Sequence, residues 1–183
     1  MRIIAGAWRG RALAAPPGQA TRPTGDRVRQ ALFDMLLHAP WGGRQVVEGV
    51  RVLDAFAGTG ALGLEALSRG AAHATFMERD RAALAALRAN VAACGAGDRA
   101  SVMAADATRP PATTAGCRLV FLDPPYGQGL VPRVLAALGT AGWIAADALV
   151  IAETAVAETL VECAAPLATR DHGAARISVW RVG

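Results

Sequence analysis

The sequence predicts an α/β protein built on a doubly wound, Rossmann-like sheet that is mostly parallel. Short apolar segments of strand character alternate with helical segments along most of the chain, which is the pattern of a parallel sheet. A glycine-rich turn joins the first long strand to the following helix, and acidic residues stand at or just past several strand ends. The 183 residues, 53% of them hydrophobic, suffice for one domain with a mostly aliphatic core.

Two elements are expected before this alternation begins. The segments on either side of residues 6–10 predict a short hairpin, and a helix is expected to begin near Thr24 and to end before Pro40. We therefore divide the chain into an N-terminal extension, residues 1–45, and a sheet domain, residues 46–183, which together form one compact unit.

The sheet domain contains five expected strands, three helices and a final hairpin. Strands are assigned to apolar runs, and helices to segments with apolar residues three or four apart that end at a glycine such as Gly70 or Gly95. Pro132 fits only in the first turn of its helix. In chain order the elements are strand 50–54, helix 61–69, strand 74–78, helix 81–93, strands 101–103 and 119–123, helix 131–138, strand 148–152, and a hairpin of residues 167–170 and 177–180.

Positive charge is concentrated at the N-terminus. All 19 basic residues are arginine, and the first thirty residues carry a local charge of +5, while the remainder carries −1. Such a basic arm predicts a polyanionic partner, with the alternative that it is only a solvated end. The arm contains Arg2, Arg9, Arg11, Arg22, Arg27 and Arg29, and we expect Arg9, Arg11, Arg22 and Arg27 to contact the partner.

Other classes of protein are disfavoured by what the chain lacks. It has no run of about 18 uncharged apolar residues, so a membrane span is not expected, and its N-terminus does not resemble a secretory signal. Its three cysteines are widely spaced and predict neither a disulfide framework nor a metal site. We expect a cytoplasmic monomer without a metal ion or a membrane contact.

The glycine-rich turn predicts a nucleotide site. Gly58, Gly60 and Gly63 have the GxGxxG spacing between a strand and a helix, where the backbone turns tightly and the helix offers free amides. Glu78 ends the next strand and can accept the hydroxyls of an adenosine ribose. Phe56, in the same turn, is included among the expected cofactor-binding residues.

Charge decides which nucleotide is favoured. Asp54 lies four residues before Gly58; its carboxylate would repel a pyrophosphate and stabilise the sulfonium and ammonium groups of S-adenosylmethionine. Asp106, after the third strand, can accept a hydrogen bond from an adenine amino group, or can cap its own loop. A nicotinamide-dependent oxidoreductase is the less favoured reading, because no residue resembles its proton-transfer group.

The loop after the fourth strand predicts the chemistry. Its prolines fix the backbone and remove two amide donors, so the Asp123 carboxylate and the Pro124 carbonyl remain as acceptors. These two could hold the hydrogens of an amino group on a planar ring while Tyr126 stacks on that ring. Holding the hydrogens out of plane would localise the nitrogen lone pair toward an electrophile. The alternative is a rigid loop with Tyr126 in the core.

With both motifs in place, the chain resembles the class I S-adenosylmethionine-dependent methyltransferases that act on exocyclic amines. It is most similar to the bacterial family that methylates N2 of a guanine in small-subunit (16S) ribosomal RNA. The resemblance extends over nearly the whole chain and is carried by residues 2–6, 8–11, 22–24, 26–29, 54–60, 63–70, Glu78 and 123–126.

The resemblance implies S-adenosylmethionine at residues 58–60, Glu78 and Asp106, and the target amine at Asp123–Tyr126. It also implies a seven-stranded sheet with an antiparallel last strand, and a 16S RNA or assembled small subunit as partner. Some relatives have phenylalanine at the position of Tyr126, which preserves stacking. The short basic extension is too small to read a long sequence, so specificity would come from a folded RNA shape.

Two further functions remain open. The loop at Asp123 would serve an adenine-N6 methyltransferase of DNA or another nucleic acid equally well. A nucleic-acid-binding module without catalysis is also compatible with the basic arm, but it leaves the acceptors of this loop unexplained.

Overall fold

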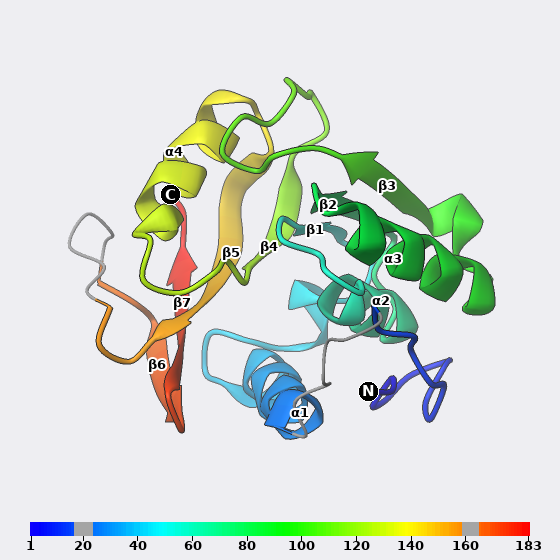
Figure 1. Cartoon of the computed structure of the whole chain (residues 1–183). Helices are drawn as coiled ribbons and strands as arrows, with labels where there is room; N and C mark the ends of the chain where they lie inside the picture. Colours follow the sequence, from blue (N-terminus) through cyan, green and yellow to red (C-terminus); the bar gives the residue numbers. More distant parts are fainter. Residues whose placement is uncertain (17–23, 159–164) are drawn as a thin grey trace.

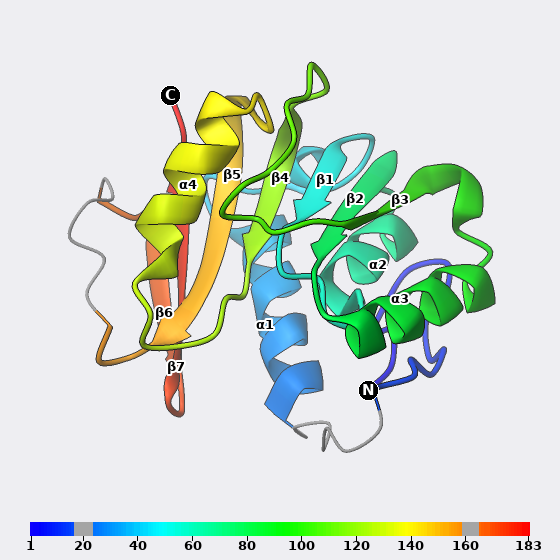
Figure 2. The same ribbon diagram turned by 45° about the horizontal axis from the view of Figure 1, so that its top comes forward.

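The computed structural model describes residues 1–16, 24–158 and 165–183, which form one seven-stranded sheet with helices on both faces (Figures 1 and 2). The helices are α1 (Thr24–His38), α2 (Ala61–Ser68), α3 (Arg81–Ala93) and α4 (Leu130–Thr140), with 3-10 turns at Arg44–Val46 and Gly97–Arg99. The strands are β1 (Arg51–Asp54), β2 (His73–Glu78), β3 (Ala100–Ala104), β4 (Cys117–Leu122), β5 (Ile144–Ala155), β6 (Ala168–His172) and β7 (Ala175–Arg181).

The strand order is β3-β2-β1-β4-β5-β7-β6. Strands β1 to β5 pair in parallel, and β7 lies antiparallel between β5 and β6. The expected doubly wound fold with an antiparallel last strand is confirmed. The order reverses between β1 and β4, and in such sheets ligands bind at the carboxyl ends of the strands beside this reversal.

Successive side chains along each strand point to opposite faces of the sheet, so the hydrophobic core has two layers. One layer contains Phe33, Leu64 and Leu87, from α1, α2 and α3, and the other contains Val134 and Leu138 from α4. In Figure 1, α1, α2 and α3 accordingly lie on one side of the sheet and α4 on the other. On each central strand, side chains of alternate residues enter opposite layers, which fixes the face to which each strand-end residue belongs.

The main departure from the expected elements concerns the fifth strand. It was expected over residues 148–152, but β5 runs from Ile144 to Ala155. Its first residue pairs with Cys117 of β4, and its extension beyond Ala152 pairs with β7. Local sequence gives no sign of the pairing with β7, which comes from twenty or more residues further along the chain.

The N-terminal hairpin is attached to the sheet domain through α2. An isolated bridge joins Arg2 to Ala12, and the buried Glu65 side chain accepts hydrogen bonds from the amides of Ile4 (2.7 Å) and Ala5 (3.0 Å). A Cβ at Gly6 would lie 1.9 Å from a backbone oxygen of α2, so only glycine allows this approach. The hairpin is therefore part of the packed structure.

Candidate active site

Register between the central strands places several strand ends side by side. Asp54, the last residue of β1, is level with Phe76 of β2 and with Phe121 of β4. Phe121 is in turn level with Ile151 of β5. Residues two positions apart on a strand share a face, so the positions two residues beyond these partners lie on the face of Asp54, further toward the carboxyl edge of the sheet.

All three of those positions are acidic. They are Glu78 at the end of β2, Asp123 directly after β4, and Glu153 within β5. Together with Asp54 they form a row of four carboxylates across four neighbouring strands, which we call the carboxylate row. Three of its members were expected from the sequence, whereas Glu153 was not.

Asp54 is the buried member of the row. Its side chain is 1% exposed, and its Oδ2 accepts a hydrogen bond from the amide of Gly63 at 3.0 Å. The pKa of Asp54 is raised to about 7, chiefly by burial; the hydrogen bond from the amide of Gly63 opposes this shift, and the charge of Glu78 adds to it. A cationic ligand beside Asp54 would stabilise the ionised form of its carboxylate, which burial disfavours.

Glycine is needed in the loop before α2 and within α2 for two different reasons. Gly58 has a φ of 52°, and the space where its Cβ would stand is open. Gly63 is instead packed tightly, because a Cβ there would lie 2.3 Å from the ring of Phe76. The loop therefore exposes backbone at Gly58, whereas Gly63 lets α2 pack closely against β2.

Glu78 is oriented by three backbone amides. Its Oε2 accepts from Gly58 at 2.8 Å, and its Oε1 accepts from Arg79 at 2.7 Å and from Asp80 at 2.8 Å. Asp80 in turn caps α3 through the amide of Ala83. These contacts hold the Glu78 carboxylate against the glycine loop.

Asp106 stands beside Glu78, because the amide of Ala105 donates to the Glu78 carbonyl. Its Oδ1 accepts from both the amide and the hydroxyl of Thr108 at 2.8 Å. These hydrogen bonds, the amide first, lower the pKa of Asp106 and keep it ionised. Asp106 thus forms its own turn at the edge where the adenine is expected.

Phe56, also expected at the cofactor, is half-buried and packs against the core layer beneath α4.

The loop after β4 is attached to the end of β5. Pro124 is buried, Asp123 is exposed, and Tyr126 is half-buried with its phenol donating a hydrogen bond to Oε1 of Glu153. The amide of Gly127 donates to Glu158 at 3.2 Å. Tyr126 is therefore held at the carboxyl edge of the sheet, which differs from the alternative of a tyrosine enclosed in the core.

Glu153 was missed because the expected fifth strand ended at Ala152. A signal was nevertheless present in the sequence, since Glu153 follows an apolar strand run just as Asp54, Glu78 and Asp123 do. Its partnership with Tyr126 depends on how β5 and the preceding loop meet, which the sequence does not show.

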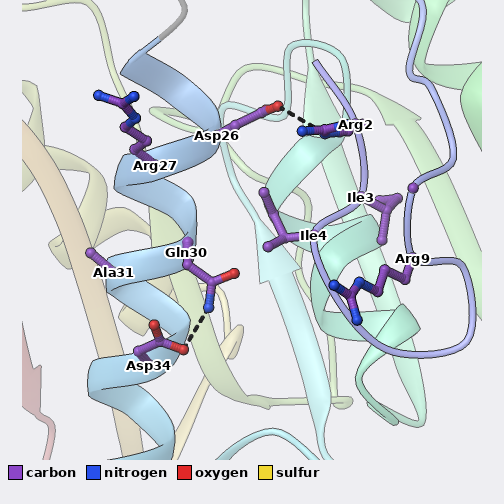
Figure 3. A pocket seen from close by; sticks show the side chains of 10 residues that line it. Arg2, Ile3, Ile4, Arg9, Asp26, Arg27, Gln30, Ala31 and Asp34 are labelled. Carbon is purple, nitrogen blue, oxygen red and sulfur yellow. Dashed lines mark hydrogen bonds and ion pairs between the residues drawn. The ribbon is translucent and has the colours of Figure 1, made fainter.

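Two of the expected RNA-binding arginines are among the residues that line one pocket. Figure 3 shows Arg9 on the hairpin and Arg27 on α1, which with Arg2 line a pocket of about 560 Å³ between these two elements. Asp26 lies within 4.0 Å of Arg2, and Asp34 lines the pocket further along α1. Both Arg9 and Arg27 are exposed.

The remaining arginines of the arm differ in their surroundings. Arg11 donates to the carbonyl of Ala93, the last residue of α3, where a cation stabilises a helix end. Arg29 is buried and paired with Asp26 at 2.9 Å, so this arginine of the basic arm is not available to a polyanion. Arg22 lies outside the described residues.

Neither a membrane-spanning helix nor a metal-binding cluster is found among the described residues. No helix within the described residues is long and apolar enough to cross a membrane. In the same part of the chain, no group of three or more His, Cys, Asp or Glu residues is arranged to hold a metal ion.

Comparison with known proteins places the chain in a family. Residues 1–181 match the family described as Conserved hypothetical protein 95. Ribosomal RNA small subunit methyltransferase D of Escherichia coli is 43% identical over 85% of this chain and 75% of its own length. The enzyme of the same name from Haemophilus influenzae is 37% identical over 84% of this chain and 78% of its own length.

Solved structures agree with this assignment. The structure of yhhF from Escherichia coli has 38% identity and a TM-score of 0.82, with 100% of this chain and 97% of that chain covered. A protein of Thermus thermophilus has 30% identity and a TM-score of 0.76, with 100% and 99% covered. The chain therefore belongs to the family of ribosomal RNA small subunit methyltransferase D.

Proposed function

We propose that this chain transfers a methyl group from S-adenosylmethionine to the N2 amine of a guanine in 16S ribosomal RNA. The observation that carries the proposal is the carboxylate row, in which a buried acid suited to a cation lies beside the acceptors suited to an amine. The name of the Escherichia coli relative, ribosomal RNA small subunit methyltransferase D, supports the ribosomal substrate.

The residues at β1 and β2 fit S-adenosylmethionine. Asp54 provides a buried negative charge for its cationic groups, and Glu78, fixed by backbone amides, provides an acceptor for its ribose. Asp106 provides an acceptor at the adenine end, and the backbone at Gly58 allows close approach. When bound, the cofactor supplies an electrophilic methyl group on a positively charged sulfur.

The residues after β4 act on the target amine. The Asp123 carboxylate and the Pro124 carbonyl accept its two hydrogens, and Tyr126 stacks on the base. This arrangement directs the nitrogen lone pair toward the cofactor side of the row, where Asp54 lies. The amine proton becomes acidic only after methyl transfer, so it can leave to water without a strong base.

The N-terminal extension supports the RNA and the cofactor site. Arg9 and Arg27 are exposed on either side of one pocket and contact phosphates of the RNA, either free or in the assembled subunit. Asn90 hydrogen-bonds both Ala14 and the Thr59 carbonyl, which brings the end of the hairpin to the glycine loop. The N-terminal extension thus also covers the cofactor, and the protein acts as a cytoplasmic monomer.

The test is nucleoside mass spectrometry of small-subunit RNA from cells that lack this gene. We expect one N2-methylguanosine to disappear, to return with the wild-type gene, and to stay absent with Asp123→Ala. Loss of an N6-methyladenine instead would establish the adenine alternative. A complete set of methylated guanines in the deleted strain would refute the proposal.

A further inference from the structure

We propose that Glu153 reads the N1–H group of the target guanine and so makes the site select guanine over other bases that carry an amine. This inference rests on the proposed function, because it assigns a base to the amine that Asp123 holds. It concerns a residue on β5 that neither the cofactor site nor the amine acceptors require.

Glu153 lies next to Asp123 at the carboxyl edge of the sheet. Leu122 of β4 is level with Ala152 of β5, so Asp123 and Glu153 follow at the same level on adjacent strands. Parallel neighbours are separated by about 4.8 Å. Glu153 lies on the side of Asp123 opposite Asp54, so a base held by its amine at Asp123 extends over β5.

The second support is the contact with the stacking residue. The Tyr126 phenol donates to Oε1 of Glu153, which places this carboxylate at the edge of the ring on which the base stacks. With Oε1 engaged by the phenol, Oε2 is the atom that accepts from a base stacked on that ring. Glu153 is only half-buried, so a ligand can reach it.

The third support is the chemistry of the bases. Guanine presents two adjacent donors, its N2 amine and its N1–H. Adenine and cytosine present an amine beside a ring nitrogen that only accepts. An ionised carboxylate also only accepts, so Glu153 pairs with guanine and is repelled by the ring nitrogen of the other two bases.

If Glu153 served only to hold the loop after β4, it would act in the same way as Glu158. The same loop is independently attached to the region after β5 by Glu158, which accepts from the amide of Gly127. Glu158 therefore provides a matched control: it is a carboxylate of the same type that holds the loop but is bonded to backbone and not to the stacking ring.

The experiment compares two RNA substrates that differ at the target base. One carries guanine, and the other carries 2-aminopurine, which keeps the N2 amine but has no N1–H. We expect wild-type kcat/KM to favour guanine by roughly 100-fold or more, since a site built around a donor rejects an analogue that lacks it. Glu153→Gln should reduce this preference by about tenfold or more, whereas Glu158→Gln should leave it unchanged.

S-adenosylmethionine affinity, measured by calorimetry, should be equal in the wild type and in Glu153→Gln, which shows that the cofactor site is intact. Equal loss of activity on both RNAs in Glu153→Gln would indicate a positioning role and overturn the inference alone. Equal use of both RNAs by the wild type would also overturn it, without relying on any variant. Failure of the wild type to methylate either RNA would overturn the proposed function as well.

Discussion

Replacing Asp54 by asparagine should stabilise the protein without cofactor at neutral pH. Folding raises the pKa of Asp54 from 3.8 to about 7, mainly through burial. Each unit corresponds to about 1.4 kcal/mol, so ionised Asp54 lowers the free energy of unfolding by about 4 kcal/mol once the pH exceeds both values. Asparagine never ionises, and its amide oxygen can still accept the hydrogen bond from Gly63.

Because the pKa of Asp54 is higher in the folded protein than in the unfolded chain, the wild type loses stability as the pH rises. Well below pH 3.8 the carboxyl is protonated in both the folded and unfolded states, and it costs no stability. As the pH rises toward 7, the unfolded chain ionises first and is favoured. The wild type should therefore lose stability relative to Asp54→Asn, by about 2.5 kcal/mol between pH 5 and pH 8.

Urea denaturation of both proteins at these two pH values measures the difference. All other titrating groups are common to the two proteins, so their contributions cancel in the comparison. Identical pH dependence in the wild type and in Asp54→Asn would show that Asp54 is ionised normally. The buried-acid argument for a cationic ligand would then be refuted.

Cofactor binding provides a second readout of the same residue. A cation beside Asp54 should lower its pKa, so the wild type should release a proton when it binds S-adenosylmethionine near pH 6.5. Calorimetry in two buffers of different ionisation enthalpy detects that proton. Asp54→Asn should bind more weakly and show no release from this position.

Substitutions at four other positions have clear expected outcomes. Glu78→Ala should weaken S-adenosylmethionine binding by about 1.5–3 kcal/mol in calorimetry, because charge-assisted hydrogen bonds are lost; an unchanged affinity would remove Glu78 from the cofactor site. Asp123→Ala should abolish methyl transfer while cofactor affinity stays near the wild-type value, and Asp123→Asn should keep some activity, in a radiolabel assay; full activity of the alanine variant would contradict the amine site. Arg9→Ala should flatten the slope of log affinity against log salt by about 0.7–0.9 in RNA binding. Arg11→Ala should lower the melting temperature more than Arg9→Ala, because Arg11 contacts a helix end; equal melting temperatures would show that this contact contributes nothing.

In the N-terminal extension, the positive charge of the sequence does not by itself predict which arginines are available to RNA. Arg29 belongs to the basic arm in the sequence, yet it is buried between Asp26 and Glu65, with its Nε 3.7 Å from a Glu65 oxygen. Glu65 also pairs with Arg69 at 2.7 Å. Glu65 belongs to α2 and lies more than thirty residues further along the chain than Arg29. From the sequence Arg29 appears available to RNA, but in the fold its ion pair with Glu65 joins α1 to α2.

The sequence by itself determined the alternation of strands and helices, because apolar spacing decides which residues a helix or strand can bury. It also determined that Asp54, Glu78 and Asp123 stand at strand ends, since turns and glycines mark those ends locally. The glycine loop and the loop at Asp123–Tyr126 were recognisable for the same reason, because each is contiguous in the chain.

Only the tertiary structure decided which of these ends become neighbours. Asp54 and Glu153 are almost one hundred residues apart, and strand order and register bring their strands into one sheet edge. The bond from Tyr126 to Glu153 and the burial of Arg29 likewise depend on packing between distant segments. Local propensity is a property of adjacent residues, whereas register, burial and shifted pKa values arise from the partners that the whole fold provides.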